Sequence, residues 1–92
     1  MIKSFSDKET QALFEGRRVR RFQAIEAQVA RRLQFLDSAT RIEDLMLRPS
    51  NRFEALGGKR KGQYSIRIND QWRLCFRFAD GDAFDVEIVD YH

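Results

Sequence analysis

The residue types best suited to chemistry gather in the second half of the chain. The chain ends in Asp90-Tyr91-His92, and His92 is its only histidine. Upstream lies the basic run Gly58-Lys59-Arg60-Lys61-Gly62, and the arginines that follow it are Arg67, Arg73 and Arg77. An imidazole with an unperturbed pKa near ~6.5 can exchange a proton close to neutral pH, and guanidinium groups can hold phosphate oxygens and stabilise a phosphorane-like transition state. Together these groups would suit cleavage of a phosphodiester if the fold brings them together, whereas a terminal histidine alone is typical of a disordered tail.

Length and composition set the class of protein. The 92 residues predict one domain, residues 1–92, with a single modest core. Hydrophobic residues at 42%, with eight Phe, favour a folded protein over a disordered one. No apolar run approaches the roughly 20 residues that span a bilayer, and the polar residues after Met1–Phe5 predict no signal peptide. The single cysteine, Cys75, cannot form an internal disulfide, so we expect a reducing, cytoplasmic location and no membrane partner.

Charge is unevenly distributed around a net value of +3. From Gly57 to Arg77 there are six basic residues and one acid, whereas from Phe78 to His92 there are five acids and no Lys or Arg. A second basic cluster, Arg17-Arg18-Val19-Arg20-Arg21, opens the middle segment. Basic clusters attract phosphate backbones, but arginine-rich surfaces are also common as solvated faces. For the Arg17–Arg21 cluster both interpretations stay open.

A capping box indicates where the first helix begins. Ser6 followed three residues later by Glu9 predicts a helix from about Asp7 to Glu15, and Gly16 is suited to end it. Before it, Ile2–Phe5 can form a short strand. Two elements therefore precede the second basic cluster.

The second helix shows the clearest period. Its apolar residues recur at spacings of three and four, as Val19, Phe22, Ile25, Val29, Leu33 and Leu36, and it should end near Asp37-Ser38. Thr40 followed by Glu43 is another capping box, which predicts a short third helix to about Met46. Pro49 prevents its continuation.

The period changes to two after residue 63. Apolar and polar residues alternate through Tyr64–Ile68, Trp72–Phe78 and Phe84–Ile88, which predicts three strands. Three-residue loops at 69–71 and 80–82 keep the apolar faces in phase, whereas a two-residue Asp80-Gly81 turn would put them out of phase. The fold class is therefore α+β, with two to three N-terminal helices packed on one face of an antiparallel sheet.

These registers arrange the opposite face of the sheet, which is polar and which we expect to be open. Arg67 lies across from Arg73, Arg73 lies across from Val89, and Tyr91 continues the same face. Like charges directly opposite each other are unfavourable, and an anion between Arg67 and Arg73 would relieve them. Tyr91 can stack on a base or orient a ribose hydroxyl, or it can simply close the last strand. Two further pairs on this face need no function: Arg77 is expected to pair with Asp85, and Cys75 lies opposite Glu87.

The whole chain resembles a known family. The residues that carry the resemblance are Met1-Ile2-Lys3-Ser4-Phe5, the segment from Leu56 to Asn69 with its Gly-flanked basic loop, Trp72-Arg73-Leu74-Cys75-Phe76 and Asp90-Tyr91-His92. This combination is similar to the HigB branch of the RelE-type toxins. It is much more specific than any of its parts.

The resemblance implies a function, partners and a fold. HigB-like proteins are toxins of type II toxin–antitoxin modules that enter the ribosomal A site, cut the mRNA there and so inhibit translation and growth. The ribose 2′-hydroxyl attacks the adjacent phosphate, without metal or cofactor, and leaves a 2′,3′-cyclic phosphate and a 5′-hydroxyl. The antitoxin is a small helix-turn-helix, HigA-like protein that represses the shared operon, so operator DNA is met only through it. The fold implied is helices on one side of a curved antiparallel sheet.

The resemblance also implies roles for individual residues. Arg73 matches the arginine that contacts the scissile phosphate, and His92 matches the histidine in proton transfer, with Asp90 and Tyr91 orienting it or the substrate. The residues expected to contact RNA are Lys59, Arg60, Lys61 and Asn69.

Two positions depart from the family pattern. Some relatives carry a lysine where this chain has Gly57 and an arginine where it has Asn69. Lys59, Lys61 or Arg67 can take over, and Arg67 is the preferred substitute because it faces Arg73. Two rival interpretations stay open: a basic binding module that blocks RNA or the ribosome by charge alone, and an inactive toxin-fold subunit that only binds an antitoxin. The binding module would depend on total charge rather than on the identity of Arg73 and His92.

Overall fold

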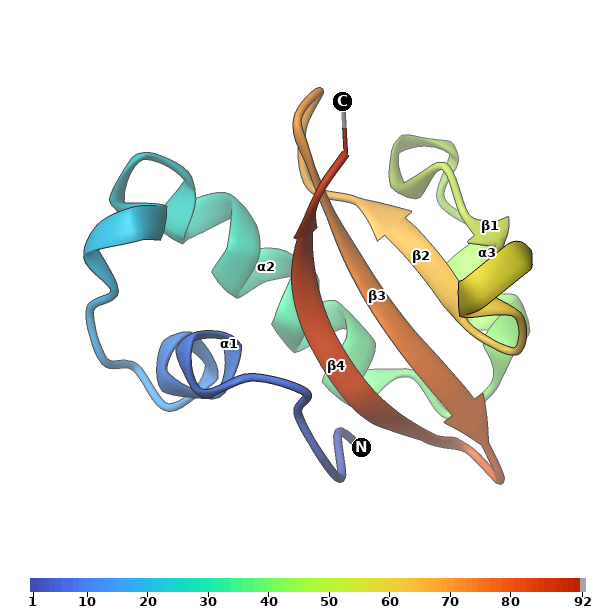
Figure 1. The fold of residues 1–92 in the computed structure, drawn as a ribbon. Coiled ribbons are helices and arrows are strands. Elements are labelled where there is room, and N and C mark those ends of the chain that lie inside the picture. The colour runs from blue at the N-terminus through green and yellow to red at the C-terminus, as the bar shows by residue number, and fades with distance from the viewer. Residues whose placement is uncertain (92) are drawn as a thin grey trace.

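An antiparallel sheet with helices on one face forms the framework of the molecule (Figure 1). The computed structural model describes residues 1–91. In chain order the elements are α1 (Lys8–Phe14), the 3₁₀ segment η1 (Arg20–Ile25), α2 (Glu26–Ser38), α3 (Ile42–Met46), η2 (Pro49–Asn51), β1 (Glu54–Ala55), η3 (Gly58–Arg60), β2 (Tyr64–Arg67), β3 (Trp72–Ala79) and β4 (Asp82–Asp90). The strands lie in the order β1-β2-β3-β4. The predicted α+β class is confirmed.

The core lies between the sheet and α2, which crosses behind the sheet in Figure 1. Val29, Leu33 and Leu36 are buried from the helix side, and Leu74 and Phe76 from the sheet side. The helix ends at Ser38, as predicted. Its first part is different, because residues 20–25 form a 3₁₀ helix.

Residue spacing accounts for that difference. The apolar residues Val19, Phe22 and Ile25 are spaced by three, which is the period of a 3₁₀ helix, and the spacing of four begins only at Ile25. The 3₁₀ turn directs Phe22 onto Trp72, with ring centroids 5.2 Å apart in an edge-to-face arrangement. The guanidinium of Arg21 lies over both rings.

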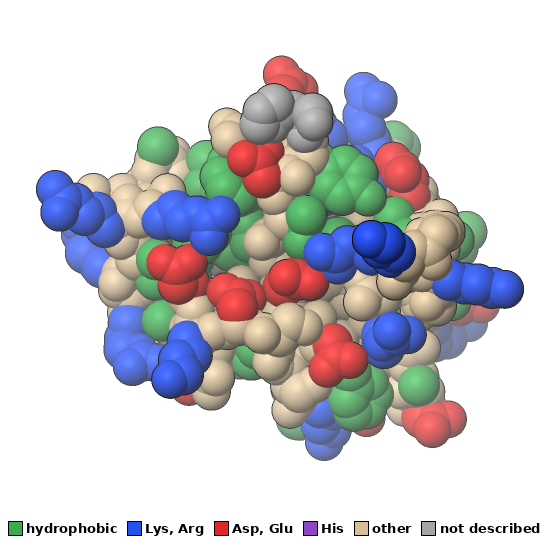
Figure 2. All heavy atoms as spheres, in the orientation of Figure 1, with side chains coloured by type: hydrophobic (Ala, Val, Ile, Leu, Met, Phe, Trp, Pro, Cys, Tyr) green, Lys and Arg blue, Asp and Glu red, His purple; other side chains and the backbone are tan. Residues whose placement is uncertain are grey.

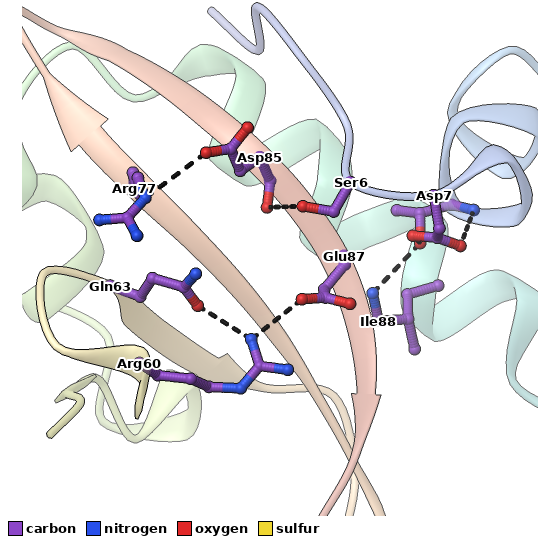
Figure 3. A network of polar contacts seen from close by, with 9 residues as sticks. Ser6, Asp7, Arg60, Gln63, Arg77, Asp85, Glu87 and Ile88 are labelled. Atoms are coloured by element: carbon purple, nitrogen blue, oxygen red, sulfur yellow. Dashed lines mark hydrogen bonds and ion pairs between the residues drawn. The ribbon is translucent and has the colours of Figure 1, made fainter. Parts of the chain in front are cut away.

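The N-terminal segment is fastened to the outer edge of β4. The predicted strand Ile2–Phe5 is reduced to two parallel bridges, to Ala83 and Val86. Helix α1 ends at Phe14, one residue before the predicted end, and Gly16 follows with φ +83°. Asp7 rather than Ser6 caps its start, accepting a hydrogen bond from the backbone N–H of Thr10 at 3.0 Å. The Ser6 hydroxyl instead donates to the carbonyl of Asp85 at 3.0 Å (Figure 3).

The buried side chain of Thr10 then connects α1 to the sheet. Its hydroxyl donates to Asp7 at 2.6 Å and accepts from the backbone N–H of Ile88 at 3.1 Å.

The residue that caps the start of α3 also differs from the predicted one. Asp44, not Glu43, accepts hydrogen bonds from the backbone N–H groups of Thr40 and Arg41, and these two bonds lower the pKa of Asp44.

The β2–β3 hairpin has the predicted register. Tyr64 pairs with Phe76, Ile66 with Leu74, and Arg67 with Arg73. The apolar members of these pairs face α2, and Ile66, Leu74 and Phe76 are completely buried. Because the side-chain period is two, this buried face fixes which residues lie on the other face.

The β3–β4 loop prediction was wrong. The connection is the two-residue turn Asp80-Gly81, and Phe78 pairs with Ala83. A β-bulge farther along, where Asp85 adopts φ +54°, absorbs one residue and restores the pairing of Leu74 with Ile88. The bulge allows the favoured tight turn and an in-phase apolar face to coexist.

Beyond the bulge, the predicted pairs on the polar face are present. Arg73 lies opposite Val89, and Cys75 lies opposite Glu87. Arg77 is opposite Phe84 rather than Asp85, yet its Nε reaches the carboxylate of Asp85 at 3.4 Å.

None of the helices in residues 1–91 is long and apolar enough to cross a membrane.

The tight turn predicts a specific sensitivity at Gly81. This glycine has φ +81°, and a Cβ there would lie 2.9 Å from the carbonyl oxygen of Thr40. We expect Gly81→Ala to lower the free energy of unfolding by about 1–3 kcal/mol, because it combines left-handed strain with a backbone clash. Thermal unfolding of the purified protein measures this.

Gly57→Ala is the matched control for that change. Gly57 has negative φ, and a Cβ at this position would have no other atom within 4 Å. The variant should unfold within about 0.5 kcal/mol of wild type. Equal losses in the two variants would contradict the assignment of strain to the Asp80-Gly81 turn.

Candidate active site

Figure 1 shows the end of β4 beside the β2–β3 loop. A pocket lies at this end of the sheet. Its volume is about 340 Å³. The lining residues come from the segment before and within β1, from β2, β3 and their loop, and from the end of the described chain: Arg52, Glu54, Arg67, Asn69, Asp70, Arg73 and Tyr91. Four of the residues singled out by sequence, Arg67, Asn69, Arg73 and Tyr91, are therefore together.

Arg73 is the most firmly held side chain of this pocket. Its Nε donates to the hydroxyl of Ser65 at 2.8 Å, and its Nη2 donates to the carbonyls of Arg52 and Ser65. The carboxylate of Glu54 lies 3.6 Å from Nη2. These contacts leave Nη1 without a hydrogen bond among residues 1–91.

The expectation that Arg73 lies on an open face was wrong. The residue is only 7% exposed, because β1 extends the sheet beyond β2 and brings the preceding chain over it. Glu54 pairs with Ser65, which places Arg52 next to the guanidinium. Arg52 has φ +43°, an uncommon left-handed conformation for a side-chain-bearing residue.

Tyr91 covers another side of the same guanidinium. The Cζ of Arg73 lies 5.7 Å from the centroid of the Tyr91 ring, within the range of a cation–π contact. The backbone N–H of Tyr91 donates to the carbonyl of Gln71 at 2.5 Å, and the Gln71 side chain donates to Asp90 at 3.2 Å. Tyr91 nevertheless stays 37% exposed, so its ring both closes the strand end and remains accessible.

Arg67 and Arg73 face each other, and each has an acidic neighbour. Asp70 forms an ion pair with Arg67, and Glu54 lies beside Arg73. The side chains of Glu54 and Asp70 are 54% and 99% exposed. Exposed ion pairs contribute only about 0–1 kcal/mol, so an incoming anion with several oxygens can replace both carboxylates.

The basic loop is only partly directed toward this pocket. Arg60 turns back over the sheet, donating to Gln63 and Glu87 at 2.9 Å each (Figure 3), and the bond to Glu87 raises the pKa of Arg60. Lys59 and Lys61 are exposed and do not line the pocket. Asn69 lines it, but its Oδ1 accepts the N–H groups of Gln71 and Trp72 and so shapes the β2–β3 loop.

The strand face below Arg73 holds a buried thiol. Cys75 is fully buried, and burial raises the pKa of its thiol to about 11.

Figure 2 shows the surface in the orientation of Figure 1, with acidic side chains across the middle and basic side chains on both sides. Among residues 1–91 no group of three or more His, Cys, Asp or Glu side chains could hold a metal ion.

Comparison with known proteins decides the family. Residues 3–92 match the HigB-like toxin family, described as the RelE-like toxin of the type II toxin–antitoxin system HigB. Toxin HigB-1 of Vibrio cholerae serotype O1 is 40% identical over 87 residues, which cover 92% of each chain. Endoribonuclease HigB of Proteus vulgaris is 38% identical over 93 residues, covering 100% of both chains. The chain belongs to the HigB-like family.

Solved structures share the fold of this HigB-like toxin. YafQ from Escherichia coli BL21(DE3) superposes with a TM-score of 0.65 at 15% identity, over 98% of this chain and 91% of that one. A chain of the YoeB–YefM toxin–antitoxin heterotetramer from Staphylococcus aureus gives 0.61 at 19% identity, over 100% and 98%. The predicted resemblance and the RelE-type fold are confirmed, and the protein is a RelE-like toxin of a type II toxin–antitoxin system.

Sequence reasoning about this HigB-like chain missed Arg52, Glu54 and Ser65. The two-residue strand β1 has no readable period, and only its pairing with β2 brings Arg52 and Glu54 to Arg73. Ser65 carried a signal, because it precedes Ile66 in a strand whose alternation places it on the face of Arg73. His92, the predicted proton-transfer residue, lies outside the described residues.

The raised pKa of Cys75 predicts how the stability of this HigB-like toxin depends on pH. The folded state holds the thiol proton more tightly than the unfolded state, where the pKa is near 9.0. The stabilisation is therefore fully present below pH 9 and is lost as the pH rises toward 11. Between pH ~8 and pH ~10.5, wild type should lose about 2 kcal/mol more unfolding free energy than Cys75→Ala.

Urea unfolding of both proteins at the two pH values measures the difference. Lysines and tyrosines titrate in both proteins, so their contributions cancel in the comparison. Parallel pH profiles for wild type and Cys75→Ala would contradict the assignment.

Proposed function

We propose that this toxin is a ribosome-dependent endoribonuclease that cuts mRNA in the ribosomal A site and so stops translation. Membership of the HigB-like family supports the proposal, as does the relative from Proteus vulgaris that is named an endoribonuclease. The observation that carries it is Arg73, whose guanidinium is fixed by Ser65 and Arg52 and faces a pocket shared with Arg67. Donors held before the substrate arrives need no reorganisation as charge develops.

The proposed reaction uses only side chains of this chain and the RNA itself. The ribose 2′-oxygen attacks the adjacent phosphorus while its proton passes to a base, and the bond from phosphorus to the 5′-oxygen breaks as that oxygen gains a proton. The products are a 2′,3′-cyclic phosphate and a 5′-hydroxyl. Arg73 and Arg67 stabilise the charge on the phosphorane oxygens, and no metal or cofactor takes part.

Proton transfer falls to the end of the chain in this proposal. His92 exchanges the proton, Asp90 orients it, and Tyr91 stacks on a nucleotide base beside Arg73. Glu54 is the other candidate base, because its carboxylate lines the pocket 3.6 Å from Arg73. Lys59 and Lys61 contact ribosomal or messenger RNA from their exposed positions, and the ion pair of Arg60 with Glu87 braces their loop.

The proposed partner besides the ribosome is an antitoxin. The YoeB toxin of Staphylococcus aureus has been solved in complex with the antitoxin YefM. By family membership we propose that a helix-turn-helix, HigA-like antitoxin binds this chain in the cytoplasm. The chain would meet operator DNA only through that antitoxin.

A toxin fold that only binds RNA by charge would not need a guanidinium buried among so many specific contacts.

Mapping the 5′ ends of an mRNA in a purified translation system tests the catalytic proposal. Wild type should cut within A-site codons only when ribosomes are present. Arg73→Ala should lower the cleavage rate about 10²–10³-fold, because it removes the fixed donor to the phosphorane, and Arg73→Lys should recover little, because an ammonium cannot reproduce the fork geometry. His92→Gln and Glu54→Gln, tested separately, identify the base.

Thermal unfolding of each variant provides the control for folding. Ribosomes stalled on uncut mRNA, equally with wild type and with folded Arg73→Ala, would overturn catalysis in favour of a charged binder. No effect on translation by any of the proteins would favour an inactive subunit that serves only the antitoxin.

Arg67 is expected to supply the second guanidinium. Its ion pair with the exposed Asp70 is easily exchanged for one to phosphate, so Arg67→Ala should slow A-site cleavage at least about tenfold. Arg77→Ala is the matched control, since Arg77 lies on the same sheet face but pairs with Asp85 outside the pocket. Intact cleavage by Arg67→Ala, alongside its loss in Arg73→Ala, would remove Arg67 from the site.

A further inference from the structure

A second basic pocket lies on the helix side of the molecule, between α2 and η2. Its volume is about 320 Å³. It is lined by arginines and neutral hydrogen-bonding residues around one aromatic ring: Arg31, Arg32, Gln34, Phe35, Ser38, Arg48, Ser50 and Asn51. No Asp or Glu is among them.

The arginines of this pocket differ from most others in the chain. Within residues 1–91, six arginines form an ion pair with a carboxylate: Arg17, Arg21, Arg60, Arg67, Arg73 and Arg77. In the same part of the chain Arg31, Arg32 and Arg48 form none. Partial burial lowers the pKa of Arg32, and so do the positive charges of Arg31, Arg67 and Arg48. The pocket therefore has positive charges in excess and the capacity to receive an anion.

Two of its side chains are held in place before any ligand arrives. The Nε of Arg32 donates to the backbone carbonyl of Arg67 at 2.9 Å. The guanidinium of Arg48 lies over the ring of Phe35, with its Cζ 4.8 Å from the ring centroid. Arg31 is exposed beside them on α2.

The contact between Arg32 and Arg67 joins this pocket to the candidate active site. Arg32 lines the second pocket, and Arg67 lines the first. The positive charge of Arg67 also lowers the pKa of Arg32, after burial and Arg31, so the two pockets present neighbouring positive charges. A nucleic-acid strand, with a phosphate at every nucleotide, is suited to such neighbouring charges. This continuity favours a nucleic-acid strand over an isolated acidic peptide.

The lining also fits RNA chemically. Arginine forks match phosphate oxygens in pairs, and the contact of Arg48 with the Phe35 ring holds one such fork in place. We propose that the Arg31–Arg32–Arg48 pocket binds a backbone phosphate of RNA outside the cleaved linkage. This inference rests on the proposed function, because it extends the same RNA-binding surface.

The test compares two double variants that lose the same charge. Arg31→Gln/Arg48→Gln alters the pocket, whereas Lys3→Gln/Arg41→Gln removes two exposed positive charges elsewhere. The probes are a fluorescent single-stranded RNA with 2′-O-methyl riboses, which cannot be cut, and 70S ribosomes with and without that RNA as message. Affinity is measured over a range of salt concentrations.

The pocket variant should bind about tenfold more weakly than the control variant. The slope of log affinity against log salt should fall by about 0.7 more than for the control, as expected for one lost phosphate contact. A defect seen only with message present assigns the phosphate to mRNA, and an equal defect on empty ribosomes assigns it to ribosomal RNA. Both results support the proposal.

Two results would overturn it. One is equal RNA and ribosome binding by the pocket and control variants. The other is unchanged RNA binding combined with weakened binding of poly-glutamate, which would make the pocket a site for an acidic peptide. A pocket defect in a protein that does not cut mRNA would leave this site standing while the catalytic proposal fails, so the two failures are distinguishable.

Discussion

The nearly complete burial of the Arg73 guanidinium is the constraint from which the rest of the site follows. An ion withdrawn from water is tolerated only if its donors and its charge are satisfied. Ser65 and the carbonyl of Arg52 accept from Nε and Nη2, and the carboxylate of Glu54 and the ring of Tyr91 offset the charge. Within residues 1–91 only Nη1 is left for a ligand in the pocket. The two-residue strand β1 and the left-handed backbone of Arg52 are therefore part of the housing of Arg73 rather than incidental loop structure.

That housing depends in turn on the β-bulge at Asp85. A tight Asp80-Gly81 turn with uninterrupted pairing would place β4 one residue out of phase. The bulge restores Leu74 to Ile88 in the core and Arg73 to Val89 on the other face. Tyr91, two residues beyond Val89, thereby reaches the face of Arg73. One inserted residue in β4 thus determines whether the end of the chain can contribute to the site.

The sequence predicts the site where local periodicity and burial determine the structure. The alternation through β2 and β3 was enough to place Arg67 opposite Arg73, because a buried apolar face permits only one register. The choice of the three-residue loop failed because a bulge satisfies both turn and register, and alternation alone does not reveal a bulge. Arg52 and Glu54 could not be found, since a two-residue strand has no period and its partner strand lies beyond the basic loop. The position of Asp7 as helix cap shows a smaller ambiguity, because Ser6 and Asp7 are both good capping residues.

Two ways of balancing positive charge distinguish the two pockets. In the candidate active site the acids Glu54 and Asp70 stand beside the arginines, and their exposure makes the pairs weak. They reduce the repulsion between Arg67 and Arg73 in the free protein without binding either tightly, so a phosphate with more oxygens and more charge can displace them. The Arg31–Arg32–Arg48 pocket has no carboxylate in its lining, and partial burial together with the neighbouring positive charges lowers the pKa of Arg32. A phosphate would therefore displace carboxylates in the first pocket, whereas in the second it would neutralise positive charge without displacing any acid of the lining.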